Sequence, residues 1–190
     1  MSGIAKLVKA IVSEKGKMNI PNALSAVRII LALFVLYLII KGNIYIAAFL
    51  FGFAAATDFF DGFIARAYKQ KTRLGKFLDL LADRILVLSP LPILMSRGLH
   101  WGIVIIIYVI EIGAVAGLLL IINTKREKEV SLAWLGKVKT FSQYIGVPYA
   151  ILGWQYFNEV MLAVAALTVL SGLNYFLKLR KVLKNNSSQY

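Results

Sequence analysis

The chain has 190 residues, 59% of them hydrophobic, and carries a formal net charge of +13. A soluble domain of this length cannot bury so much apolar surface in one core, so the composition excludes an ordinary soluble protein and indicates a membrane protein. The apolar runs are long and do not alternate with polar residues, which favours spanning helices over barrel strands. Cysteine is absent, which excludes disulfides and thiolate metal sites.

The first 20 residues predict an amphipathic helix that lies in the membrane interface. This segment is too short and too polar to span a bilayer, and its apolar residues alternate with lysines. Six apolar runs follow, at residues 23–40, 44–67, 75–95, 101–122, 134–154 and 160–177. We therefore expect an all-α integral membrane protein in which residues 21–178 form one six-helix membrane domain. Residues 179–190 are predicted to be a basic, disordered tail.

The lysines and arginines form short blocks between these runs, which is typical of topology signals and of contacts to anionic headgroups. This arrangement argues against nucleic acid as a partner. Six spans place both termini on one side, together with four basic blocks, and leave only Lys41 and Arg97 on the other side. The positive-inside rule then predicts a multi-pass protein of the cytoplasmic membrane with both termini in the cytoplasm.

Four of the nine acidic residues lie where the second and third runs reach the predicted cytoplasmic side: Asp58, Asp61, Asp79 and Asp83. A carboxylate at the edge of a span costs about 2–3 kcal/mol, so four together need compensation. The first pair is three residues apart and the second pair four, so each pair projects from one helix face. The short link at 67–74 predicts that the two helices are antiparallel neighbours. Two divalent cations would neutralise such a cluster of hard oxygen ligands.

The alternative for these aspartates is ion pairing without metal, for which nearby cations are available: Arg66, Arg73, Lys76 and Arg84. Small residues favour a ligand site. Gly62 and Gly75 each lie beside an aspartate pair, where a missing side chain lets a phosphorylated ligand approach. Arg66, one turn after Gly62, could bind phosphate oxygens bidentately. The same small residues would also suit close helix packing.

Residues 58–83 carry the pattern D-x2-D-G-x2-A-R-x8-G-x3-D-x3-D, and on these residues the chain resembles the CDP-alcohol phosphotransferase family. The resemblance implies that the four aspartates bind two Mg²⁺ or Mn²⁺ ions and that Asp83 is also the general base toward the acceptor hydroxyl. It implies a CDP site formed by Asn22, Asp58, Gly62, Ala65, Arg66 and Gly75. It also implies a homodimer, for which Gly113-x3-Gly117 is a possible packing face within or between subunits.

Residues 19–28 and 135–140 resemble the phosphatidylglycerophosphate synthase branch of that family, which implies CDP-diacylglycerol as donor and sn-glycerol 3-phosphate as acceptor. Lys137 and Lys139 would then meet the acceptor phosphate, although both could serve only the positive-inside rule. One departure is that Ile110 precedes Glu111, where many members have arginine. Glu111 is an intramembrane carboxylate, for which we expect either a functional role or pairing with Arg84.

Other functions remain open on the sequence. The same chemistry could use another acceptor or donor, such as inositol phosphate, phosphatidylglycerol or an archaeal ether lipid. A divalent-cation transporter could also place four aspartates between helices, but it predicts acids near mid-span. A structural scaffold predicts that Asp83→Asn has no biochemical effect.

Overall fold

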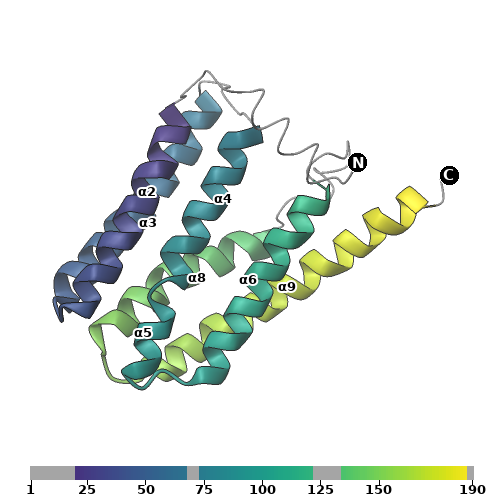
Figure 1. Cartoon of the computed structure of the whole chain (residues 1–190). Coiled ribbons are helices and arrows are strands. Elements are labelled where there is room, and N and C mark those ends of the chain that lie inside the picture. Colours follow the sequence, from purple (N-terminus) through teal and green to yellow (C-terminus); the bar gives the residue numbers. More distant parts are fainter. Residues whose placement is uncertain (1–19, 68–72, 122–133, 188–190) are drawn as a thin grey trace.

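The computed structural model describes residues 20–67, 73–121 and 134–187; within them, at 20–22, 58–67, 73–77, 119–121 and 182–187, it describes only the helical backbone. All regular structure in these residues is helical (Figure 1). The helices are α2 (Ile20–Ile40), α3 (Ile44–Ala67), α4 (Arg73–Leu88), α5 (Leu91–Ser96), α6 (Trp101–Ile121), α8 (Trp134–Leu152) and α9 (Phe157–Ser187).

The predicted all-α membrane architecture is confirmed. Among the described residues, three helices contain a stretch long and apolar enough to cross a membrane: Ala23–Ile40, Trp101–Leu118 and Phe157–Lys181. A shorter apolar stretch, Ile44–Thr57, lies in α3. Helices also occupy the remaining predicted runs. Many large apolar side chains are exposed on the outside of the bundle, as lipid contact requires.

Two expectations about helix boundaries were wrong. The run 75–95 is not one helix, because α4 ends at Leu88 and α5 begins at Leu91. Pro90 has no N–H to donate and its ring clashes with the preceding turn, which ends a helix. The tail was expected to be disordered from residue 179, but α9 continues through Ser187. The predicted interfacial helix lies outside the described residues, apart from Ile20, where α2 begins.

Helix α2 packs along both α3 and α4, while α3 and α4 contact each other less. In Figure 1, α2 and α3 lie side by side and α4 stands next to them. On the other side of the molecule α6 packs on α9, and α8 joins the two halves through contacts with α3 and α9. The prediction that α3 and α4 are neighbours is confirmed, but it is mainly α2 that holds them together.

The chain direction reverses between successive long helices, so the start of α2, the end of α3 and the start of α4 meet at one end of the bundle (Figure 1). We call this the carboxylate end. Tight turns make the reversals at the opposite end. Gly42 and Gly98 have φ values of +80° and +99°, a conformation that glycine adopts without steric cost.

The glycines of α6 pack within this chain. A Cβ added at Gly113 would lie 2.8 Å from Phe176 Cζ, and one at Gly117 would lie 2.8 Å from Leu179 Cδ2. Both neighbours are on α9. Of the two uses expected for the G-x3-G motif, the structure shows helix packing inside one subunit.

Candidate active site

The two aspartates of α4 share one partner. Arg28, on α2, donates from Nη1 to Asp79 Oδ1 at 3.0 Å and to Asp83 Oδ1 at 2.8 Å. The four-residue spacing therefore places both carboxylates on one side of α4, as predicted. Arg28 is fully buried, whereas the side chains of Asp79 and Asp83 are 48% and 17% exposed. The carboxylates thus lie between a buried guanidinium and the solvent-accessible side of the site.

The other aspartates lie near the end of α3. Asp58 and Asp61 fall in its last turns, so their backbone is at the carboxylate end, close to the start of α4. Their side chains lie outside the described residues. The same holds for five further predicted site residues, whose helical positions are known: Asn22 in α2, Gly62, Ala65 and Arg66 in α3, and Gly75 in α4.

The described part of this site fits a hard divalent cation. Its donors are carboxylate oxygens, the ligands that Mg²⁺ and Mn²⁺ prefer, and both aspartates are partly accessible. Among the residues that the structure describes, no group of three potential metal ligands occurs. A complete metal site would therefore need ligands beyond Asp79 and Asp83, and the backbone of α3 places Asp58 and Asp61 at the same end of the bundle.

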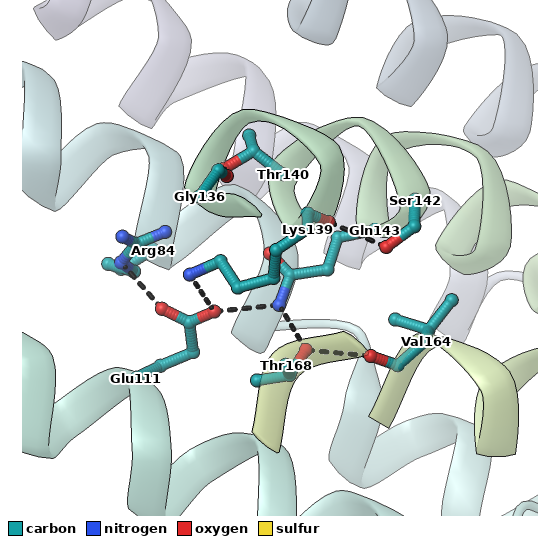
Figure 2. A network of polar contacts seen from close by, with 9 residues as sticks. All are labelled: Arg84, Glu111, Gly136, Lys139, Thr140, Ser142, Gln143, Val164 and Thr168. Carbon is teal, nitrogen blue, oxygen red and sulfur yellow. Dashed lines mark hydrogen bonds and ion pairs between the residues drawn. The ribbon is translucent and has the colours of Figure 1, made fainter. Parts of the chain in front are cut away.

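A second polar cluster lies next to this site, at the junction of α4, α6, α8 and α9 (Figure 2). Glu111, on α6, forms ion pairs with Arg84 Nε at 2.9 Å through Oε2 and with Lys139 Nζ at 2.7 Å through Oε1. Gln143 Nε2 also donates to Glu111 Oε1, at 2.7 Å, and to Thr168 Oγ1 at 3.2 Å. All five side chains are buried. We call these five residues the Glu111 cluster.

The Glu111 cluster carries one excess positive charge, because Arg84 and Lys139 face a single carboxylate. Arg84 directly follows Asp83 in α4, so the ion pair to Glu111 fixes the rotation of the helix that carries the aspartates. The Lys139 ammonium is also close enough to Asp83 for the two charges to interact. The cluster can therefore orient α4 and balance the charge of the neighbouring carboxylates.

These contacts decide between several expectations. Of the two alternatives expected for Glu111, the structure shows the pairing with Arg84. Of the cations suggested as ion-pair partners for the aspartates, Arg84 pairs with Glu111, and the side chains of the other three lie outside the described residues. Lys139, predicted to bind the acceptor, is buried and bonded to Glu111, whereas Lys137 is exposed.

Three residues of these two clusters had no predicted role in the site: Arg28, Gln143 and Thr168. Arg28 had a recognisable signal, because an arginine inside an apolar span needs a partner. Gln143 and Thr168 had a weaker one. Gln143 lies four residues after Lys139, so both project from one face of α8, and Thr168 is a polar residue within an apolar helix.

Fold and site together define an integral membrane protein with a carboxylate site at one end of a helical bundle. A model of the CDP-alcohol phosphatidyltransferase family matches residues 18–171. The relatives include proteins named CDP-diacylglycerol–glycerol-3-phosphate 3-phosphatidyltransferase from Shigella flexneri serotype 5b (strain 8401) and from Escherichia coli (strain K12). Each is 33% identical over 173 residues, which cover 83% of this chain and 92% of the relative.

The chain belongs to the CDP-alcohol phosphatidyltransferase family. It is therefore a transferase, and members of this family generally use a divalent metal. The resemblance drawn from the aspartate pattern is confirmed.

Proposed function

We propose that this enzyme transfers the phosphatidyl group of CDP-diacylglycerol to sn-glycerol 3-phosphate, giving phosphatidylglycerophosphate and CMP. The observation that carries the proposal is the pair Asp79 and Asp83, which present their carboxylates together on one side of α4 at the end of the bundle where α3 brings Asp58 and Asp61. The names of the relatives at 33% identity support the choice of donor and acceptor.

In this proposal Asp58, Asp61, Asp79 and Asp83 hold two Mg²⁺ or Mn²⁺ ions. When bound, these ions neutralise the pyrophosphate of the donor and stabilise the departing CMP. Asp83 accepts the proton of the acceptor hydroxyl, whose oxygen forms a bond to the β-phosphorus while the bond from that phosphorus to CMP breaks. Asn22, Asp58, Gly62, Ala65, Arg66 and Gly75 bind the CDP moiety. Positioning and electrostatics supply most of the rate, as in other phosphoryl transfers.

For the acceptor phosphate, the exposure of Lys137 supports a direct contact. Lys139 is bonded to Glu111, so its contribution is the buried positive charge of the Glu111 cluster beside Asp83. The proposal also places the site at the cytoplasmic face of the membrane and includes a homodimer. The concentration of basic blocks on one side supports the orientation.

The test is CMP release from CDP-diacylglycerol by the enzyme purified in lipid nanodiscs. The acceptors would be sn-glycerol 3-phosphate, inositol 1-phosphate, phosphatidylglycerol and none, each with Mg²⁺ or EDTA. We expect release only with Mg²⁺ and sn-glycerol 3-phosphate. The matched carboxylate variants are Asp83→Asn, expected to lose at least about a hundredfold in kcat, and Glu159→Gln at the opposite end, expected to stay active. Preference for another acceptor would overturn the acceptor assignment, and an active Asp83→Asn would overturn its role as base.

A further inference from the structure

Arg28 is an arginine buried inside an apolar span. It lies in the stretch Ala23–Ile40, its side chain has no exposed surface, and among the residues whose side chains the structure describes it is the largest that is fully buried. Its Nη1 donates to one oxygen of Asp79 and to one oxygen of Asp83. A single nitrogen of α2 therefore lies between the two carboxylates of α4.

This arrangement solves two electrostatic problems at once. Two carboxylates that share one donor are close enough to repel each other, and water screens Asp83, which is 17% exposed, less than Asp79, which is 48% exposed. A buried guanidinium is equally unfavourable without an anion and cannot lose its proton in a protein. Each group compensates the other, so in the absence of metal Arg28 supplies a positive charge that the site requires.

A divalent cation that binds Asp79 and Asp83 also neutralises the two carboxylates, as Arg28 does in the absence of metal. It competes with Nη1 for the same carboxylate oxygens, and it is repelled by the permanent charge of the guanidinium. The carboxylates are therefore less available to metal than they would be without Arg28, but they remain together while metal is absent.

We propose that Arg28 is a positioning residue that acts as a built-in counter-cation: it holds Asp79 and Asp83 together in the metal-free enzyme and thereby limits the affinity of the site for divalent metal. This inference rests on the proposed function of the two aspartates as metal ligands. It goes beyond that function because it assigns to α2 the control of how tightly the metal binds.

The test compares two variants. Arg28→Met removes the charge and keeps a long side chain, whereas Arg28→Lys keeps the charge but replaces the planar guanidinium by an ammonium group. Arg97→Met is the matched control, because Arg97 donates to Ile39 O near the turn that begins at Lys41, at the opposite end. Thermal unfolding is followed by tryptophan fluorescence in EDTA and in a Mg²⁺ series, and Mn²⁺ affinity by electron paramagnetic resonance. Neither readout requires turnover.

We expect Arg28→Met to melt at least about 5 °C below the wild type in EDTA and to recover most of this loss in Mg²⁺. Its Mn²⁺ affinity should rise about tenfold or more. Arg28→Lys should fall between Arg28→Met and the wild type in Mg²⁺-dependent stabilisation, and Arg97→Met should match the wild type. If Arg28→Met does not fold in either condition, Arg28→Lys decides, because its Mg²⁺-dependent stabilisation should exceed that of the wild type.

Equal or weaker Mn²⁺ binding by Arg28→Met, or Mg²⁺-dependent stabilisation of Arg28→Lys equal to that of the wild type, would overturn the inference. Failure of the underlying function looks different. If the wild type itself shows neither Mg²⁺-dependent stabilisation nor Mn²⁺ binding, the metal site is wrong, whatever the variants do.

Discussion

Replacing Glu111 by glutamine removes the one carboxylate of the Glu111 cluster and leaves Arg84 and Lys139 as buried cations without an anion between them. The contacts at risk are the ion pairs at 2.9 and 2.7 Å and the hydrogen bond from Gln143 at 2.7 Å. Since Glu111 has no exposed surface, water cannot replace them.

Breaking a buried ion pair from one side costs about 3–5 kcal/mol. We expect about 3 kcal/mol for Glu111→Gln, because the amide oxygen can still accept from Lys139 or from Gln143. For a chain of this length, 1 kcal/mol corresponds to roughly 2–4 °C in Tm, so the variant should melt roughly 6–12 °C lower. Thr168→Val removes the 3.2 Å bond from Gln143 and the 2.8 Å bond that Thr168 Oγ1 donates to Val164 O, and should cost about 1–2 kcal/mol.

Both variants are measured by thermal unfolding in the same detergent, with tryptophan fluorescence as the signal, since the chain has three tryptophans and no cysteine for thiol dyes. The double variant Glu111→Gln with Lys139→Met removes one of the stranded cations. It should be more stable than the sum of the two single effects implies. A Glu111→Gln variant that melts within about 2 °C of the wild type, or no lower than Thr168→Val, would refute the view that charge compensation stabilises this junction.

Four further variants test other parts of the structure. Gly146→Ala should lower the free energy of unfolding by about 1–3 kcal/mol, because the new Cβ would lie 2.6 Å from Val164 Cγ2. Gly52→Ala has nothing within 4 Å of the new Cβ and should be neutral or stabilising by up to about 1 kcal/mol. Unfolding in SDS titrations compares the two variants. Tyr108→Phe should cost about 1 kcal/mol in the same titration, since the Tyr108 hydroxyl donates to the Leu88 carbonyl at the end of α4, and an unchanged midpoint would contradict this. Lys137→Gln should raise the KM for sn-glycerol 3-phosphate about tenfold with Tm unchanged, because Lys137 is exposed; steady-state kinetics with an unaltered KM would remove it from the acceptor site.

Much of the fold follows from local properties of the sequence. Apart from the break near Pro90, the helices lie where the apolar runs predicted them, and a turn occupies the gap between the first two runs at residues 41–43. The run 75–95 is long enough to predict one helix, but Pro90 within it ends the first helix. The helical continuation to Ser187 was missed because polar residues at the end of a span resemble a disordered tail in composition.

The candidate site was predictable to the extent that it depends on spacing. Asp79 and Asp83 lie on one side of α4 because four residues make about one helical turn, and this holds in any fold that keeps the helix. The importance of the aspartates followed from the cost of carboxylates at a membrane boundary. The family resemblance rested on the same local pattern and was confirmed by comparison.

What the sequence by itself determined is therefore the membrane class, the helices and the face that each acidic pair occupies, because these depend on hydropathy and on neighbours within one turn. The tertiary structure decided which distant charges meet, apart from Arg84 and Glu111, whose pairing was one of the alternatives expected from the sequence. Arg28 lies 51 and 55 positions from its two aspartates, and Lys139 lies 28 positions from Glu111. A buried charge requires a counter-charge, but several lysines and arginines could supply it. The packing of α2 on α4, and of α8 beside α6, selects the one that is within reach.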